Sequence, residues 1–292
     1  MKDDSLDVSS KNIAVSNPAR LYLDLLKKSL LNEIFLNVEV AYFHARDCVE
    51  RGMVPDLATV LDAEANLAEC FDLAVAARRE GKHLKRSLKN IGFSHTMIGR
   101  ERLEQLDECI HRVLSDNVPG DFIECGVWRG GATIFMRGAL AVHGIQDRTV
   151  WVADSFEGLP KPSLEQDARI DLSKERFPQL AVSVDQVMRN FRKYDLLDDN
   201  VRFLQGWFKD TLPLAPIDRL ALLRLDGDLY ESTRDCLNAL YDKVSPGGYI
   251  IIDDYGCLKC CADAVTDFRV AHGINNPITR IDWTGAYWRK GR

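Results

Sequence analysis

The stretch FIECGVWRGG, residues 122–131, decides the fold class of this chain. A short apolar run leads straight into a glycine-rich turn, and an apolar segment at helical spacing follows. Glycines at such a turn let the backbone approach a ligand closely, where the sheets of α/β proteins bind cofactors. The spacing Glu-x-Gly-x-x-x-Gly differs from the Gly-x-Gly-x-x-Gly pattern that binds a dinucleotide pyrophosphate. The leading Glu124 argues against a phosphate and favours a cationic ligand.

Short β-rich runs alternate with helical segments from this turn onward. The runs predict strands at 122–125, 149–154, 201–204, 220–225 and 249–253. The segments between them, such as 132–143 and 232–244, have helical spacing. This alternation is typical of βαβ units, so we expect a parallel sheet covered by helices on both faces, a Rossmann-like α/β fold.

The chain before this sheet is expected to be helical. Residues 1–17 are polar and lack periodicity, so we predict a disordered tail. Residues 18–117 carry apolar side chains at helical spacing, notably over 21–34 and 57–75, and form a helical N-terminal extension. Residues 118–292 form the α/β core. The many apolar residues of the extension predict a homo-oligomer.

The composition excludes several classes of partner. Lys and Arg number 38 against 44 Asp and Glu, the net charge is −6, and the sequence has no basic block. A nucleic acid or an anionic membrane is therefore not expected as a partner. The chain start lacks the basic and apolar regions of a signal peptide, and no apolar run reaches membrane-spanning length. We therefore expect a cytoplasmic protein.

Eight cysteines are expected to be reduced in that compartment. Three of them, Cys257, Cys260 and Cys261, lie close together in the sequence. No second CxxC or His pair completes a four-ligand zinc site, so their expected role is packing at the start of a helix.

The ends of the second and third predicted strands indicate an adenosine-containing cofactor. Asp154 ends the second strand, at the position where such folds bind ribose hydroxyls through a carboxylate. Gly206 and Trp207 follow the third strand, where the aromatic ring is placed to flank an adenine. Together with the acidic glycine loop, this order predicts S-adenosylmethionine, whose amino group and sulfonium are cationic.

Four aspartates follow the fourth and fifth strands. Asp226 and Asp228 come after the fourth strand, and Asp253 with Asp254 after the fifth. Neighbouring parallel strands lie ~4.8 Å apart, so these carboxylates should converge at one edge of the sheet. Clustered carboxylates repel one another unless a cation neutralises them, and oxygen ligands without Cys or His select Mg²⁺ or a similar ion. The alternative, a helix cap or turn residue, is common for single aspartates.

Long motifs in this chain closely resemble those of the macrocin O-methyltransferase family. They occupy residues 95–106, 118–131, 150–160, 198–213, 223–233 and 245–256, and residues 22–34 resemble the opening helix of the family. The similarity covers nearly all of residues 91–290. The resemblance implies a class I S-adenosylmethionine-dependent methyltransferase fold and Mg²⁺-dependent methylation of a sugar hydroxyl on a glycosylated secondary metabolite.

The resemblance also assigns site residues by position. It implies an S-adenosylmethionine site lined by Thr96, Met97, Glu124, Gly126, Trp128, Arg129, Asp154, Ser155 and Phe156. It places Mg²⁺ on Asp226, Asp253 and Asp254 and makes Asp228 the general base. The helical region forms the substrate lid of the family. This chain departs from the family there, with Asn90-Ile91-Gly92-Phe93 in place of an aromatic-Pro pair.

Other functions are compatible with parts of this pattern. A catechol-like acceptor suits the same fold and metal, because its adjacent hydroxyls chelate a cation in the same way. A nicotinamide oxidoreductase is disfavoured by the missing Gly-x-Gly-x-x-Gly pattern. A non-catalytic metabolite-binding protein would not need all four aspartates. His95, next to Thr96 and Met97, is an alternative base, although a lone histidine is more often structural.

Overall fold

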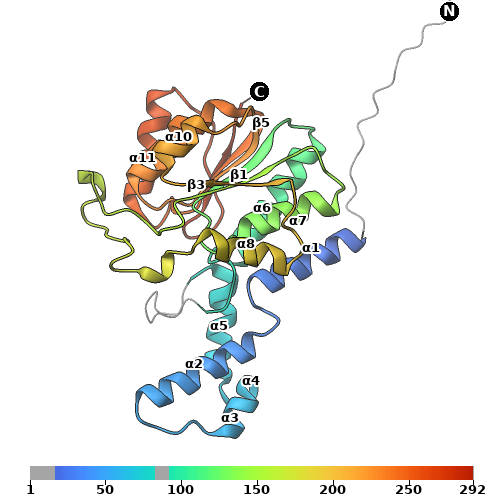
Figure 1. Cartoon of the computed structure of the whole chain (residues 1–292), viewed down its shortest axis with the longest axis vertical. Coiled ribbons are helices and arrows are strands. Elements are labelled where there is room, and N and C mark those ends of the chain that lie inside the picture. The colour runs from blue at the N-terminus through green and yellow to red at the C-terminus, as the bar shows by residue number, and fades with distance from the viewer. Residues whose placement is uncertain (1–16, 83–91, 292) are drawn as a thin grey trace, which may run out of the picture.

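The computed structural model describes residues 17–82 and 92–291. The predicted disordered tail lies outside the described residues except for Asn17, which begins the first helix. Figure 1 shows an α/β body and, below it, a smaller lobe formed by helices from the N-terminal part of the chain. Among the described residues, no helix combines the length and the apolar character needed to cross a membrane.

A seven-stranded sheet forms the centre of the body, in the order β3-β2-β1-β4-β5-β7-β6. Its strands are β1 (Asp121–Cys125), β2 (Val150–Asp154), β3 (Val201–Gln205), β4 (Leu220–Leu225), β5 (Val244–Ile252), β6 (Thr279–Arg280) and β7 (Ala286–Arg289). β1 to β5 are parallel, which confirms the five predicted strands and their direction. The expectation of an entirely parallel sheet is wrong, because β7 pairs antiparallel with β5 and β6 with β7.

Helices cover both faces of the sheet, as predicted. The helices of the body are α1 (Asn17–Leu30), α6 (Gly99–Ser115), α7 (Gly131–Val142), α8 (Val184–Lys193), α9 (Phe208–Thr211), α10 (Tyr230–Leu240) and α11 (Lys259–Ala271). Alternate strand residues point to opposite faces, so Phe122 packs in one core with α1, α6, α7 and α8. Its neighbour Ile123 packs in the other core with α10 and α11.

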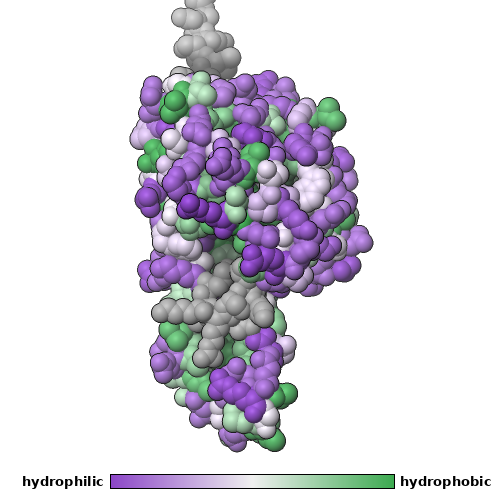
Figure 2. All heavy atoms as spheres, turned by 90° about the vertical axis from the view of Figure 1, so that its left-hand side faces the viewer, coloured by the Kyte–Doolittle hydropathy of each residue, from purple (hydrophilic) through white to green (hydrophobic). Residues whose placement is uncertain are grey.

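The helical lobe consists of α2 (Leu36–Glu50), α3 (Leu57–Leu61), α4 (Ala63–Asn66) and α5 (Ala68–Glu80). The periodicity over 57–75 predicted one continuous stretch, but the structure has three helices there: the Asp56 side chain caps α3, the Asp62 side chain caps α4, and α5 begins after Leu67 without a side-chain cap. Leu36, Val40 and Ala74 belong to its small core. Figure 2 shows hydrophobic residues on the surface of this lobe, where Leu57 and Leu61 are among the exposed ones.

The glycine loop is in direct contact with the end of β4. Gly126 has a φ of +89°, in the left-handed region that favours glycine. A Cβ atom built on Gly126 would lie 1.9 Å from the carbonyl oxygen of Asp226. This packing joins the predicted cofactor loop to the predicted acidic edge, and it excludes any side chain at position 126.

We predict that Gly126→Ala destabilises the fold by roughly 3 kcal/mol or more, because left-handed strain of about 1–2 kcal/mol adds to overpacking of about 1–3 kcal/mol. Gly144→Ala is the matched control, since Gly144 has a φ of +69° and a Cβ atom added there would meet nothing within 4 Å among the described residues. The control should be destabilised only by the left-handed strain, about 1–2 kcal/mol. Urea unfolding measures both free energies, and equal losses would contradict the prediction.

Candidate active site

A cavity of about 360 Å³ opens at the carboxyl ends of the parallel strands. In open α/β sheets this edge is where ligands bind, and the volume is within the range of small-molecule sites. The residues predicted from the sequence that line it are Met97, Gly126, Trp128, Asp154, Ser155, Gly206, Trp207, Asp226 and Asp228. One cavity therefore joins predicted cofactor residues to Asp226 and Asp228, whereas Asp253 and Asp254 are not among its lining residues in the described chain.

Four residues that the resemblance assigned to the cofactor site are not among the described residues lining this cavity: Thr96, Glu124, Arg129 and Phe156. Thr96 is buried, and a Cβ on Gly131 would lie 2.6 Å from its side chain. Phe156 is also buried and packs against Phe203, with ring centroids 6.1 Å apart. These two side chains support the wall of the cavity from behind.

Arg129 fastens the segment that precedes Thr96 and Met97. Its Nη1 donates hydrogen bonds to the carbonyl oxygens of Gly92, at 3.0 Å, and Ser94, at 2.8 Å. Its guanidinium lies 4.2 Å from the centroid of the Trp128 ring, a cation–π contact. Arg129 thus holds together two stretches that were predicted separately to bind the cofactor.

Asp154 ties the end of β2 to the glycine loop. Its carboxylate accepts hydrogen bonds from the backbone N–H groups of Val127 and Phe156, both at 2.8 Å. Burial raises the pKa of this carboxyl group, and these N–H groups oppose the rise. Asp154 lines the cavity and also shapes the loop on which Gly126 and Trp128 lie.

Glu124 faces a buried arginine. Its Oε1 lies 2.6 Å from Nη1 of Arg224, and both side chains are buried. Burial raises the pKa of Glu124 to about 8, and its Oε2 has no hydrogen-bond partner among the described residues. Arg224 was not predicted as a site residue, although an arginine inside the apolar strand β4 is a signal, since charged residues are rarely buried unless paired.

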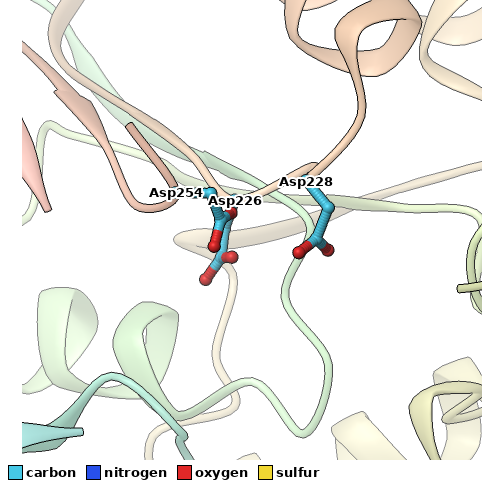
Figure 3. Close-up of side chains that lie close together, drawn as sticks. All are labelled: Asp226, Asp228 and Asp254. Atoms are coloured by element: carbon cyan, nitrogen blue, oxygen red, sulfur yellow. The ribbon is translucent and has the colours of Figure 1, made fainter. Parts of the chain in front are cut away.

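Three aspartates form a group that is suited to a cation. One carboxylate oxygen from each of Asp226, Asp228 and Asp254 lies within 4.8 Å of the others. Figure 3 shows the three carboxylates on the same side of the strand ends, with Asp228 beside the other two. Burial raises the pKa of all three, and repulsion from neighbouring aspartates, among them Asp253 in each case, raises it further. Oδ2 of Asp254 is buried without a hydrogen-bond partner among the described residues.

Asp253 has different surroundings from its neighbour Asp254. Its two carboxylate oxygens accept hydrogen bonds from Arg102 and Arg224. Burial alone would raise the pKa of Asp253, but the two guanidinium groups outweigh it and lower the pKa. Arg102, on α6, also lies 3.1 Å from Asp282, before β7. Asp253 is thus outside the three-aspartate group, and its predicted role as a metal ligand stays a prediction.

Asp228 enters the cavity from a left-handed turn. β4 ends at Leu225, and Asp228 has a φ of +58°, which is uncommon for a residue other than glycine. The backbone N–H of Leu229 donates a 2.6 Å hydrogen bond to the carbonyl oxygen of Gly227. The backbone therefore turns sharply here, and this turn directs the Asp228 side chain toward Asp226.

His95 bridges helices and is not among the cavity-lining residues of the described chain. Its Nδ1 lies 2.6 Å from the hydroxyl of Tyr194, and its backbone N–H donates to the carbonyl oxygen of Leu30. Burial lowers the pKa of His95 to about 4. A neutral, hydrogen-bonded imidazole at this place favours the structural role over that of a base.

Two of the three cysteines near the site, Cys260 and Cys261, are buried, whereas Cys257 is exposed. Cys261 Sγ lies 3.6 Å from the hydroxyl of Thr233, and Cys260 Sγ lies 3.6 Å from the carbonyl oxygen of Asp228. Cys257 Sγ lies 2.9 Å from the hydroxyl of Thr284. The expected packing role therefore fits Cys260 and Cys261 but not Cys257.

Comparisons with known proteins agree with this architecture. The model of the macrocin O-methyltransferase family (TylF) matches residues 19–290. A demethyldecarbamoylnovobiocin O-methyltransferase of Streptomyces niveus is 55% identical over 68% of this chain and 77% of its own length. The 8-demethyl-8-(2,3-dimethoxy-alpha-L-rhamnosyl)-tetracenomycin-C 4'-O-methyltransferase of Streptomyces olivaceus is 46% identical over 92% of each chain. The mycinamicin III 3''-O-methyltransferase of Micromonospora griseorubida is 44% identical over 94% of this chain and 98% of its own.

A solved structure leads to the same family. The O-methyltransferase NovP is 44% identical, has a TM-score of 0.77, and covers 94% of this chain and 100% of its own. The matches exclude a nicotinamide oxidoreductase and a non-catalytic binding protein. The chain belongs to the macrocin O-methyltransferase family and is an S-adenosylmethionine-dependent O-methyltransferase with the Rossmann-like class I fold.

Proposed function

We propose that this enzyme methylates a hydroxyl group on the sugar of a glycosylated, antibiotic-type metabolite, with the help of a divalent cation such as Mg²⁺. The observation that carries the proposal is the single cavity that Gly126 of the cofactor loop shares with Asp226 and Asp228. A methyl donor and a hydroxyl acceptor must lie next to each other for direct transfer, and the cavity offers one space for both.

The cofactor occupies the half of the cavity formed by Met97, Gly126, Trp128, Asp154 and Ser155, with Gly206 and Trp207 on its other side. Glycine at 126 leaves the backbone open to close approach. Asp154 acts mainly by holding the loop through Val127 and Phe156, and its position beside the cavity supports the predicted contact with ribose. Thr96, Glu124, Arg129 and Phe156 contribute from behind the lining.

The three-aspartate group fits a divalent cation. Its carboxylates repel one another, and an oxygen of Asp254 is buried without a partner among the described residues, so a positive charge would relieve both penalties. Oxygen ligands alone favour Mg²⁺ or a similar hard ion. We assign Asp226 and Asp254 as ligands. Asp253 is the third ligand by resemblance, and it would bind the ion while its two oxygens also accept hydrogen bonds from Arg102 and Arg224.

Asp228 is the proposed general base. An ion held by these carboxylates supplies positive charge that makes a neighbouring hydroxyl more acidic. The Asp228 carboxylate takes the hydroxyl proton while the oxygen forms a bond to the methyl carbon. The bond between that carbon and the cofactor sulfur breaks, and the sulfur keeps the electron pair. The product is a methyl ether, and the cofactor leaves as its neutral thioether.

The acceptor class rests on the relatives. The name of the tetracenomycin enzyme includes a rhamnosyl group, and the three relatives are named for novobiocin, tetracenomycin and mycinamicin compounds. A catechol-like acceptor remains the alternative, and assays of both classes side by side distinguish them. The lid role of the helical region, like the homo-oligomer, is also a proposal. Lobe residues 36–80 are not among those lining the cavity in the described parts of the chain, so a lid would have to close over it.

We predict that S-adenosylhomocysteine, the demethylated product of the cofactor, stabilises the protein, whereas NAD and ATP do not. A ligand that binds only the folded state adds about 2.7 kcal/mol at 100 times its Kd. Asp154→Ala should weaken binding of S-adenosylhomocysteine at least roughly tenfold, because the glycine loop loses two hydrogen bonds, each worth about 1 kcal/mol. Calorimetric titration measures this affinity. Asp171→Ala is the control, because the Asp171 carboxylate accepts a local hydrogen bond from the backbone N–H of Ser173. Equal affinities for all three proteins would refute the role of Asp154.

We predict that the aspartates separate metal binding from proton transfer. Asp226→Ala and Asp254→Ala should weaken Mn²⁺ binding and turnover together, because each removes a ligand. Asp228→Asn should leave Mn²⁺ affinity nearly intact and lower turnover by roughly a hundredfold or more. Titration with Mn²⁺ followed by electron paramagnetic resonance measures binding, and single-turnover kinetics measure the methyl transfer.

Asp235→Asn provides a control for this series, because Asp235 lines the same cavity but pairs with Arg234 at 2.8 Å. It should change neither quantity substantially. Full activity in excess EDTA would rule out the metal. Near-normal turnover of Asp228→Asn would rule out Asp228 as the base, and an unchanged Mn²⁺ affinity of Asp253→Ala would remove Asp253 from the ligands.

A further inference from the structure

The connection between β2 and α8, residues 155–183, forms one wall of the cavity. Leu159, Pro160, Lys161 and Ser163 all line it, as does Glu231, whose carboxylate accepts a hydrogen bond from the Ser163 hydroxyl. This connection is long and contains short 3₁₀ turns at Glu165–Asp167 and Pro178–Leu180 and an isolated β-bridge between Leu159 and Ser173. Its position therefore depends on the contacts that fasten it to the body.

Asp167 makes two of these contacts. Its side chain is buried, with 1% of the residue exposed. Its Oδ1 accepts a 2.7 Å hydrogen bond from the backbone N–H of Tyr230, and its Oδ2 accepts a 3.2 Å hydrogen bond from that of Glu231. These are the first two residues of α10. Leu229, at the N-cap position, has no side-chain acceptor, so a carboxylate distant in the sequence caps this helix.

The cap acts next to the proposed base. Asp228 lies two residues before Tyr230 and has the left-handed φ of +58°. Such a conformation costs about 1–2 kcal/mol and persists only where the surrounding structure fixes it. The hydrogen bonds of Asp167 hold the two N–H groups that follow this turn. A second contact runs in parallel, from the Ser163 hydroxyl to the Glu231 carboxylate.

We propose that Asp167 is a positioning residue that fixes both the acceptor wall, residues 159–163, and the direction of the Asp228 carboxylate. Its hydrogen bonds attach the 155–183 connection to α10, an attachment that we call the latch. The acceptor wall and Asp228 therefore keep the same position relative to each other. Asp167 is not among the cavity-lining residues of the described chain, and it acts through the groups that it holds. This inference rests on the proposed function, because it takes Asp228 as the base and the Glu231 side of the cavity as the acceptor side.

A helix cap also stabilises a fold without any effect on the reaction, typically by ~1 kcal/mol. The two roles differ in what they leave unchanged. A merely structural cap would lower the melting temperature and leave the kinetics of the folded enzyme intact. The latch should instead change acceptor KM and kcat, while cofactor binding stays near normal, since the cofactor half of the cavity is built on β1, β2 and β3.

The experiment compares Asp167→Ala and Asp167→Asn with Asp121→Ala. Asp121 is the matched control, because its carboxylate also accepts hydrogen bonds from two N–H groups, the backbone N–H of Thr149 at 2.9 Å and the indole N–H of Trp151 at 2.8 Å. It lies at the start of β1, on the opposite edge of the sheet. Melting temperature, S-adenosylhomocysteine affinity, and acceptor KM and kcat are measured, with mycinamicin III and demethyldecarbamoylnovobiocin as acceptors.

Asp167→Ala should lower acceptor kcat/KM at least roughly thirtyfold and change S-adenosylhomocysteine affinity less than threefold. Asp167→Asn keeps one acceptor oxygen, so its loss should be intermediate, and it serves if the alanine variant does not fold. Asp121→Ala should lower the melting temperature by a similar amount and leave acceptor KM and kcat unchanged. Acceptor KM and kcat within twofold of wild type in the Asp167 variants would overturn the proposal, as would an equal kinetic loss in Asp121→Ala.

Hydrogen–deuterium exchange tests the latch without an acceptor. Amides of residues 159–163 and of Tyr230 and Glu231 should exchange at least tenfold faster in the Asp167 variants than in wild type. If the wild-type enzyme methylates neither acceptor, the sugar assignment loses its support. The exchange rates still test whether Asp167 attaches the connection to α10. Unchanged exchange in these segments would overturn it in either case.

Discussion

The Arg224 guanidinium is the group on which the arrangement of the site depends. It lies in the centre of the sheet on β4 and binds carboxylates from three adjacent strand ends, those of Glu124, Asp226 and Asp253. Burial alone would lower the pKa of Arg224, but the three carboxylates outweigh this effect and raise it. A buried ion costs several kcal/mol in desolvation, so the arginine is tolerated only because these partners surround it. Removing the Arg224 guanidinium would take away the positive charge that Glu124, Asp226 and Asp253 share, at the edge where the cofactor loop and acidic group meet.

The same network links the sheet to the outer elements. Arg102 of α6 shares Asp253 with Arg224 and also pairs with Asp282 in the turn between β6 and β7. α6 begins directly after the segment that carries Thr96 and Met97. Ion pairs therefore connect Arg102 on α6, through the carboxyl ends of β1, β4 and β5, with Asp282 in the C-terminal hairpin.

The sequence predicted the sheet and its functional edge well, because both follow from local patterns. Apolar runs located β1 to β5, and the rule that parallel strands end at one edge brought Asp226, Asp228 and Asp254 together. Asp253 and Asp254 could not be told apart in this way. They are consecutive in the chain, and which of them faces the arginines depends on the distant residues Arg102 and Arg224. The short β6 and β7 lacked a readable pattern, and the apolar periodicity of 57–75 did not reveal the helix breaks at Asp62 and Leu67.

The left-handed turn at Asp228 narrows the choice of amino acid at this position beyond what proton transfer requires. Asparagine and aspartate tolerate a positive φ far better than residues with longer or branched side chains. A glutamate would keep the charge but would strain the backbone and extend the carboxylate by one methylene toward Asp226. The local backbone thus selects side-chain length independently of acidity. Aspartate meets both demands: the backbone conformation limits the length of the side chain, and proton transfer requires a carboxylate.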